Sequence, residues 1–180
     1  MRFKHKIATP SFISIIVIFF IAFGTLLYYT PWDNAEKGKS LIDNDITSYY
    51  GYLPATFIHK DLSLGFIDAD SIDYSSKHQF WPKTAPNGNK VFKFTMGMSV
   101  LYSPFFLIAH TYSSISSEYT NNGFSKPYEF LLALSSLFYL ILGLYFLRKI
   151  LLIYFNEILS AFVLFITVVG TNLFYYCTAE

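Results

Sequence analysis

Three long apolar runs without a charged residue constrain the fold of this chain more than any other feature. They are Ser11 to Tyr29, Phe130 to Leu147 and Ile158 to Tyr176. A helix of about 20 apolar residues crosses a hydrocarbon core about 30 Å thick and pairs its own backbone groups. Only 14% of the chain is charged, against about 25% in a typical soluble domain. The sequence therefore predicts a mainly α-helical, polytopic membrane protein with three transmembrane helices, and the lipid bilayer is its first expected partner.

The first apolar run has two interpretations, a retained signal anchor or a cleaved signal peptide. Its apolar core is longer than the usual 7–15 residues of a signal peptide, and no A-x-A-like cleavage site follows it. We therefore expect a signal anchor.

Positive charge predicts the orientation, because Lys and Arg favour the cytoplasmic side. Arg2, Lys4 and Lys6 precede the first run, and Arg148 and Lys149 follow the second. With both clusters in the cytoplasm, residues 1–29 form the cytoplasmic N-terminus and first transmembrane helix. Residues 30–127 form a large extracytoplasmic loop with juxtamembrane helices, and 128–180 form a transmembrane hairpin. The expected localisation is the plasma membrane, multi-pass, with the N-terminus in the cytoplasm.

This path requires that the shorter apolar stretch Met96 to Ala109 does not cross the bilayer. The stretch has the length of an interfacial or re-entrant segment, and we expect Pro104 to interrupt it and His110 to end it. The alternative, a crossing here, would place Arg148 and Lys149 outside, against the charge rule.

The large loop is rich in aromatic residues and carries clear local patterns. Asp45 to Lys60 reads as an amphipathic helix with Asp45 as its cap and Pro54 breaking or kinking it. Asn87-Gly88-Asn89 and Asn121-Asn122-Gly123 predict turns. Val91 to Phe94 is a candidate short strand.

The candidate catalytic residues are Asp45 and, as an alternative, Asp43, at the start of that amphipathic helix. A carboxylate there can take a proton from an acceptor hydroxyl or help to bind a divalent cation. Tyr49 and Tyr50 follow and can stack on a sugar ring or rest at the headgroups. The structural alternative is that Asp45 only caps the helix and Asp43 is a solvated loop residue.

Two further candidates are basic. Lys93 precedes the Met96 to Ala109 stretch and can meet a lipid phosphate at headgroup depth; ordinary snorkelling is the alternative. His59 can carry a proton, although a surface histidine after a helix is the commoner case.

Several classes of site are not supported. The single cysteine, Cys177, allows no internal disulfide, and no Cys/His spacing indicates a metal site. The net charge of +1 does not favour nucleic acid. No phosphate-binding loop, dinucleotide fingerprint, H-E-x-x-H motif or nucleophile elbow is present.

The order of these features resembles the N-terminal part of the GT-C class of polytopic membrane glycosyltransferases, especially bacterial dolichyl-phosphate-mannose-protein mannosyltransferase-like proteins. The resemblance rests on four segments: Asp45-x-x-x-Tyr49-Tyr50-x-Tyr52-Leu53-Pro54-Ala55, Lys93-Phe94-Thr95-Met96-Gly97, Ser103-Pro104-Phe105-Phe106 and Gly170-Thr171-Asn172-Leu173-Phe174-Tyr175-Tyr176. It implies a polyprenyl-phosphate sugar donor, an envelope acceptor and the bacterial inner membrane. In this class an acid of the first outer loop is the general base, and Asp45 is the matching position here.

The resemblance also implies that further spans or subunits complete the site, since we expect the chain to be an N-terminal fragment of a longer transferase. Two other classes remain open: a non-catalytic accessory, transport or scaffolding subunit of envelope biogenesis, and a truncated reading frame without function.

Overall fold

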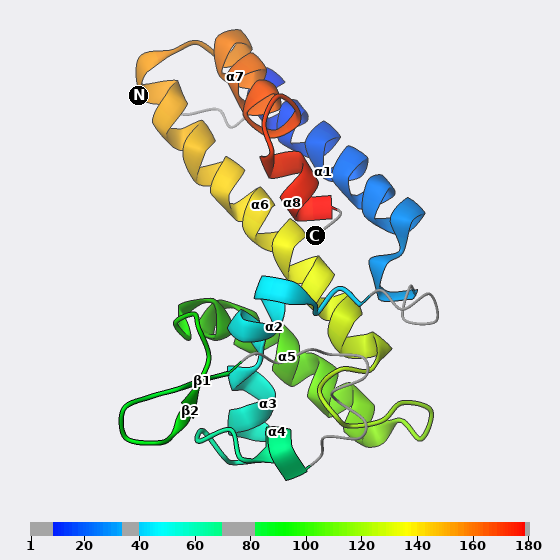
Figure 1. Cartoon of the computed structure of the whole chain (residues 1–180). Helices are drawn as coiled ribbons and strands as arrows, with labels where there is room; N and C mark the ends of the chain where they lie inside the picture. Colours follow the sequence, from blue (N-terminus) through cyan, green and yellow to red (C-terminus); the bar gives the residue numbers. More distant parts are fainter. Residues whose placement is uncertain (1–8, 34–39, 70–81, 179–180) are drawn as a thin grey trace. The chain divides into compact units, whose positions relative to one another are not determined.

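The computed structural model describes residues 9–33, 40–69 and 82–178 and is mainly α-helical (Figure 1). The chain divides into two compact units. We call residues 1–30 with 135–180 the span unit, and residues 31–134 the loop unit. Two of the described helices are long and apolar enough to cross a membrane, within Pro10–Asp33 and Lys126–Tyr154. The predicted α-helical class is confirmed, and these two helices match the first two predicted spans. Arg2, Lys4 and Lys6 lie outside the described residues.

Helix α1 (Pro10–Tyr29) begins with a proline in its first turn, where the missing N–H costs no helical hydrogen bond. It ends at Thr30, which has a left-handed backbone (φ 39°) and donates its N–H to the carbonyl of Leu26 at 3.0 Å. One stripe of α1 is buried, at spacings of three and four residues: Ser11, Ile15, Ile18, Ala22 and Leu26. This spacing places them on one helical face, which packs against the rest of the span unit.

The third predicted span is not one helix. Helix α7 (Glu157–Val169) ends at Gly170, and a separate helix α8 (Leu173–Thr178) follows. A Cβ on Gly170 would lie 2.8 Å from the carbonyl oxygen of Ile166, so the tight turn requires glycine. The prediction of a continuous third transmembrane helix was therefore wrong, because the uncharged run hides this break.

The span unit arranges α1, α7 and the later part of α6 (Lys126–Tyr154) side by side (Figure 1). Ser14 near the start of α1 donates its hydroxyl to the carbonyl of Ala161 near the start of α7, at 3.0 Å. Three residues earlier on α1, Ser11 bonds Glu157, four residues earlier on α7, so the two helices run in the same direction. Helix α6, which lies between them in sequence, runs the opposite way, because its end meets the start of α1 at Ser11. The core of this unit comprises Ile15, Ile18, Ala22, Leu137, Leu140, Leu144, Leu151, Leu164 and Val168.

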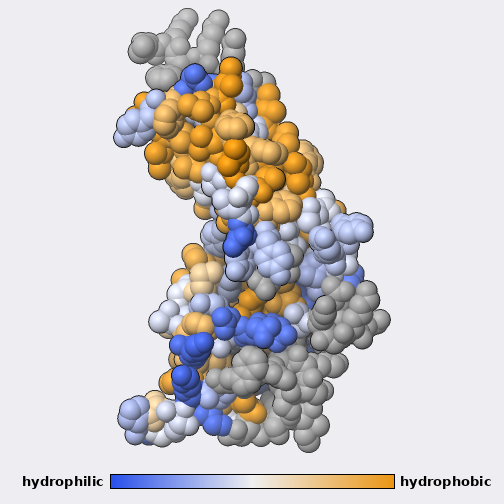
Figure 2. Space-filling model, turned by 45° about the horizontal axis from the view of Figure 1, so that its top comes forward, coloured by the Kyte–Doolittle hydropathy of each residue, from blue (hydrophilic) through white to orange (hydrophobic). Residues whose placement is uncertain are grey.

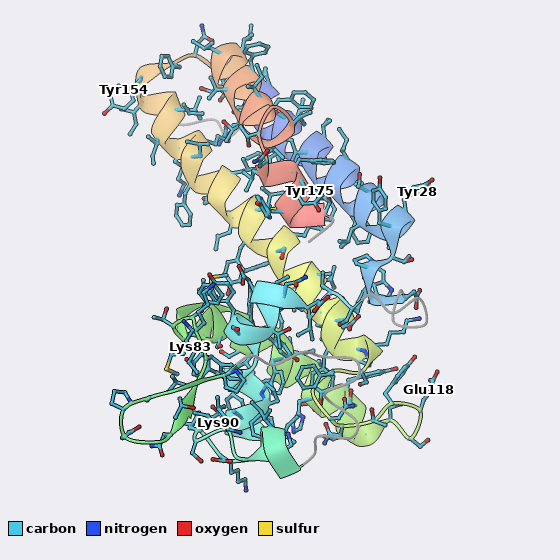
Figure 3. All side chains as sticks on the ribbon, viewed as in Figure 1. Tyr28, Lys83, Lys90, Glu118, Tyr154 and Tyr175 are labelled. Carbon is cyan, nitrogen blue, oxygen red and sulfur yellow. The ribbon has the colours of Figure 1, made fainter. Side chains whose placement is uncertain are left out.

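Large apolar side chains also cover the outside of the span unit. Figure 2 shows this as a nearly continuous apolar face. Phe20, Ile153 and Ile158 are 65%, 72% and 74% exposed. Tyr28 and Tyr154 project away from the packed helices (Figure 3). An apolar exterior of this kind suits contact with lipid and not with water.

The predicted helix Asp45 to Lys60 is two helices, α2 (Asn44–Tyr50) and α3 (Tyr52–Phe57), joined at Gly51. A Cβ on Gly51 would lie 2.4 Å from the ring of Phe92, so this joint needs glycine. Pro54 lies in the first turn of α3, where its missing N–H costs no hydrogen bond within that helix. A continuous helix would need this N–H for the carbonyl of Tyr50, so the break at Gly51 agrees with the break or kink predicted from Pro54. The cap of α2 is Asp43, not Asp45.

Helix α5 (Gly97–Ile115) corrects two further expectations, since Pro104 does not interrupt it and His110 does not end it. Proline removes the N–H that would bond the carbonyl of Val100. The hydroxyl of Ser103 donates to that carbonyl instead, at 2.8 Å. Helix α5 is not one of the two described helices that qualify as candidate spans, which is consistent with the predicted non-crossing segment.

The rest of the loop unit contains α4 (Phe66–Ala69) and a small antiparallel hairpin of β1 (Lys83–Thr84) and β2 (Lys90–Val91). The strand is shorter than the predicted Val91 to Phe94. Both predicted turns are confirmed by glycines with positive φ, Gly88 (85°) and Gly123 (87°). The main core of the unit comprises Ile42, Tyr50, Leu53, Phe106, Ala109, Phe124, Tyr128 and Leu132.

Candidate functional site

The two candidate acids occupy different environments at the start of α2. Asp43 has an extended backbone and accepts a hydrogen bond from the N–H of Asn44 at 2.7 Å, as a helix cap. Asp45 lies in the first turn of α2 and is exposed. Within the described parts of the chain, Asp45 forms no hydrogen bond or ion pair. Its carboxylate is therefore the one available to a ligand, so Asp45 remains the first candidate for the catalytic carboxylate and Asp43 the alternative.

Tyr49 and Lys93 are brought together by Phe94. The rings of Tyr49 and Phe94 stack with centroids 4.4 Å apart and planes 21° apart. The ammonium of Lys93 lies 4.8 Å from the centroid of Phe94, within cation–π distance. We call Tyr49, Lys93 and Phe94 the Lys93 cluster.

Neighbouring backbone contacts fix this cluster. The hydroxyl of Tyr52 donates to the carbonyl of Phe94 at 2.8 Å, and the hydroxyl of Ser99 donates to the carbonyl of Tyr49. Burial raises the pKa of the Tyr102 hydroxyl, and its electrostatic interaction with the nearby Tyr49 raises it further. Helices α2, α3 and α5 thus all hold the two aromatic rings in place.

Asp45 lies on the same side of α2 as the cluster. Asp45 and Tyr49 are four residues apart, so their side chains lie one turn apart on one helical face. A carboxylate, an aromatic pair and an ammonium are therefore linked in series, the first step by helical spacing and the others by ring contacts. Separation in sequence hid the link to Lys93, because it depends on how the segment before α5 packs on α2.

Tyr50 and His59 are not part of this arrangement. Tyr50 is 1% exposed, and its hydroxyl donates to the carbonyl of Gly123 at 2.5 Å. The ring of His59 is half-buried and stacks on Phe66 with centroids 4.1 Å apart. Both side chains serve the packing of the loop unit, and we do not retain them as ligand contacts.

Sequence reasoning missed a partly buried chain of polar side chains between α5 and α6. Nδ1 of His110 lies 2.8 Å from the hydroxyl of Tyr128, which donates to the side-chain oxygen of Asn121 at 2.7 Å. Nearby, Glu129 is only 2% exposed and accepts a hydrogen bond from Ser40. No pattern in the sequence indicates that Glu129 is buried within the loop unit.

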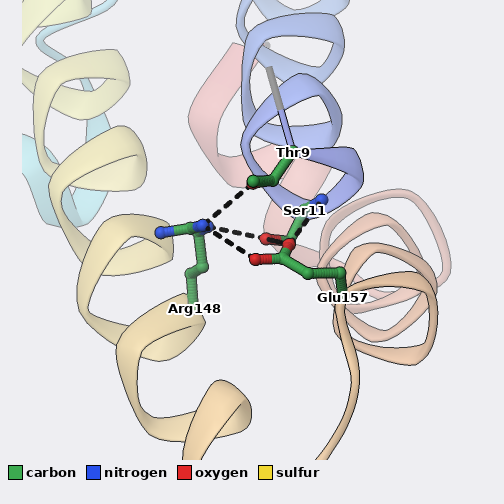
Figure 4. A network of polar contacts seen from close by, with 4 residues as sticks. All are labelled: Thr9, Ser11, Arg148 and Glu157. Atoms are coloured by element: carbon green, nitrogen blue, oxygen red, sulfur yellow. Dashed lines mark hydrogen bonds and ion pairs between the residues drawn. The ribbon is translucent and has the colours of Figure 1, made fainter. Parts of the chain in front are cut away.

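The span unit contains a second polar network, at the start of α1 (Figure 4). Arg148 donates from Nε to the hydroxyl of Ser11 at 2.6 Å and from Nη2 to the hydroxyl of Thr9 at 3.0 Å. Nη2 also lies 3.3 Å from a carboxylate oxygen of Glu157, and Ser11 donates to the other oxygen. The start of α1, the end of α6 and the start of α7 therefore meet at one end of the span unit.

The described residues contain no group of three or more His, Cys, Asp or Glu side chains that could hold a metal ion. The divalent cation proposed for Asp43 and Asp45 therefore remains a prediction. Cys177 is a free thiol.

Comparison with protein-family models, with curated proteins and with solved structures found no match.

Proposed function

We propose that this chain is a membrane glycosyltransferase-like protein of the bacterial inner membrane, with the loop unit on the outer side. It transfers a sugar from a polyprenyl-phosphate donor to an envelope acceptor, and further spans or subunits complete its site. The observation that carries the proposal is the line of an exposed carboxylate, a stacked aromatic pair and an ammonium formed by Asp45, Tyr49, Phe94 and Lys93.

Each group in this line has a chemical role in an inverting transfer. The carboxylate of Asp45 takes the proton of an acceptor hydroxyl. The acceptor oxygen then bonds to the anomeric carbon as the bond from that carbon to the phosphate oxygen breaks. The polyprenyl phosphate leaves with the electron pair, and the ammonium of Lys93 stabilises its charge.

The aromatic pair suits the sugar and the membrane surface. Tyr49 is half-buried, and its backbone is held by Ser99, so the ring is rigid without being enclosed. Aromatic rings offer an apolar face to sugar C–H groups and a polar tip to water. Phe94 keeps Tyr49 oriented and at the same time carries Lys93.

The proposal is tested by measuring the transfer of labelled sugar from a polyprenyl-phosphate donor in membranes that contain the protein as the cell makes it, with or without a single substitution. Asp45→Asn keeps the size of the side chain but removes the base, so we expect transfer to fall by about 100-fold or more. Asp45→Glu should retain measurable transfer. Lys93→Gln should weaken transfer, whereas Lys60→Gln, which removes another exposed lysine of the loop unit, should not.

Membrane insertion of every variant is checked by its abundance in the membrane fraction. Wild-type transfer by Asp45→Asn would remove Asp45 from the role of base. Unaltered envelope glycosylation by all four variants would favour the accessory-subunit alternative.

A further inference from the structure

A pocket of about 450 Å³ lies in the loop unit, at the first turns of α6. Trp32, Ile108, Tyr112, Phe130 and Leu131 give it an apolar lining, and Lys126 lies at its edge. The rings of Trp32 and Phe130 meet edge to face, with centroids 4.9 Å apart. Its volume is in the range of small-molecule pockets, about 300–1,000 Å³.

The pocket is built from the ends of the two candidate spans. Trp32 closes the first, Pro10–Asp33, and Lys126 opens the second, Lys126–Tyr154. The ends of membrane helices lie at the depth of the lipid headgroups, where tryptophan and tyrosine gather. The pocket therefore lies where an acyl chain begins below its headgroup.

Helix α5 extends this apolar surface. Leu101, Ile108, Tyr112 and Ile115 share one helical face by their spacing and are 44%, 59%, 54% and 83% exposed. The buried side of the same helix carries Ser99, Phe106, Ala109 and Ser113. Helix α5 thus turns an apolar face outwards, as a helix that lies in a membrane surface does.

Charged groups at the pocket edge indicate which lipid fits. The ammonium of Lys126 lies 2.5 Å from a carboxylate oxygen of Asp33, and both side chains are nearly half exposed. Glu118, in the loop between α5 and α6 (Figure 3), also acts electrostatically on Lys126 and accepts a hydrogen bond from Tyr119. One cation therefore stands among two carboxylates. An exposed ion pair of this kind contributes little to stability and opens easily.

We propose that this pocket binds one acyl chain of a phospholipid with a primary ammonium headgroup, of the phosphatidylethanolamine type. Lys126 binds the lipid phosphate, and Asp33 accepts hydrogen bonds from the lipid ammonium. A purely anionic headgroup would leave the two carboxylates without a cation, and a choline headgroup has no N–H to donate. This lipid site is separate from the Lys93 cluster and does not depend on the proposed transfer.

The test uses Trp32 as the reporter. With Trp81→Phe, Trp32 is the only tryptophan, and its quenching is measured in nanodiscs that contain one brominated lipid at a set mole fraction. We expect brominated phosphatidylethanolamine to quench more than its mole fraction predicts, with a preference of about threefold over phosphatidylcholine and phosphatidylglycerol, as a single exposed charge contact gives. Equal quenching by the three lipids, or a preference for phosphatidylglycerol, would overturn the proposal.

Variants separate the headgroup from the acyl chain. Asp33→Asn with Lys126→Gln should abolish the headgroup preference. Ile108→Phe, which fills the pocket, should reduce quenching, whereas Val100→Phe, at an equally exposed position of α5 (59%) that does not line the pocket, should not. An unchanged preference in the charge variant, or equal quenching in both phenylalanine variants, would contradict this site. The lipid comparison in the wild-type pocket stands even where a variant fails to fold.

Discussion

Arg148 and Glu157, nine residues apart across the turn from α6 to α7, form an ion pair at 3.3 Å that also holds Ser11 and Thr9 at the start of α1. The two ionic side chains are only 18% and 35% exposed. The turn from α6 to α7 is thus joined to the start of α1, more than 130 residues away in sequence, through one guanidinium, which provides several rigid donors to carboxylate and hydroxyl oxygens.

Arg148→Met should destabilise the protein, because it leaves Glu157 and Ser11 without their shared donor. We expect a loss of about 1–3 kcal/mol in the free energy of unfolding, measured by thermal unfolding in detergent. Arg148→Met with Glu157→Gln should recover part of that loss, since no uncompensated charge remains. Lys149→Met, at the neighbouring exposed position, is the control. Equal stability of Arg148→Met and Lys149→Met would show that the network contributes nothing.

Tyr49 and Tyr50 are adjacent but should respond differently to substitution. Tyr50→Phe leaves the buried carbonyl of Gly123 without its hydroxyl donor, so we expect a loss of about 1–3 kcal/mol in stability, with sugar transfer per folded molecule retained. Tyr49→Ala removes the stacked ring and should reduce transfer, with a stability loss of only about 0.5–1.5 kcal/mol. Thermal unfolding and the transfer assay are measured on the same preparations. The reverse pattern would mean that the ligand-facing tyrosine has been misidentified.

Ser103 should stabilise α5 by replacing the N–H that Pro104 lacks. Ser103→Ala leaves the carbonyl of Val100 without that donor, and we expect a loss of about 0.5–1.5 kcal/mol in thermal unfolding. Ser114→Ala is the matched control. Ser114 also donates to a carbonyl of its own helix, that of His110, at 2.7 Å, but no proline removes the N–H that bonds this carbonyl within the helix. Equal effects of the two substitutions would exclude a special role for Ser103.

Asp61 should make the segment from Ser63 to Phe66 sensitive to acid. Its carboxylate accepts hydrogen bonds from Ser63, Gly65 and Phe66, and these bonds, led by that from the Ser63 hydroxyl, lower its pKa below 3.8. A carboxyl with a lowered folded-state pKa stabilises the fold above its ordinary pKa, and this stability is lost as the pH falls through the folded-state value. Hydrogen-exchange protection of the Gly65 and Phe66 amides should therefore fall below about pH 3.8. In Asp61→Asn, protection should be lower and independent of pH over this range; an acid-dependent fall that persists would assign the effect to another group.

The sequence was sufficient for those parts of the fold that depend on local pattern. The uncharged runs predicted α1 and α6, and the Asn-Gly dipeptides predicted the turns at Gly88 and Gly123. A break near Pro54 was predicted, but its position at Gly51 was not, and neither was the break at Gly170. Each position depends on what approaches the glycine, the ring of Phe92 in one case and the carbonyl of Ile166 in the other.

Only part of the candidate site could be predicted from the sequence. The exposed acid and the neighbouring tyrosines could be found from their place on an amphipathic segment. Which tyrosine faces outwards could not, since Tyr50 is buried only because Phe106, Phe124 and the Gly123 carbonyl meet it from distant parts of the chain. The pocket beside Lys126 was not predicted either, because its lining combines Trp32 with residues of α5 and α6, which lie far apart in sequence.

The measurement that tests the account most directly is the labelling of single cysteines from outside intact cells. In a Cys177→Ser background, Ser117→Cys reports on the exposed loop after α5, and Lys149→Cys reports on the exposed end of α6. A membrane-impermeant maleimide should label the cysteine at position 117 directly and that at position 149 only after the membrane is permeabilised. Labelling of position 149 but not of position 117 in intact cells would place Asp45 and the Lys93 cluster in the cytoplasm and contradict the proposed transfer at the outer surface.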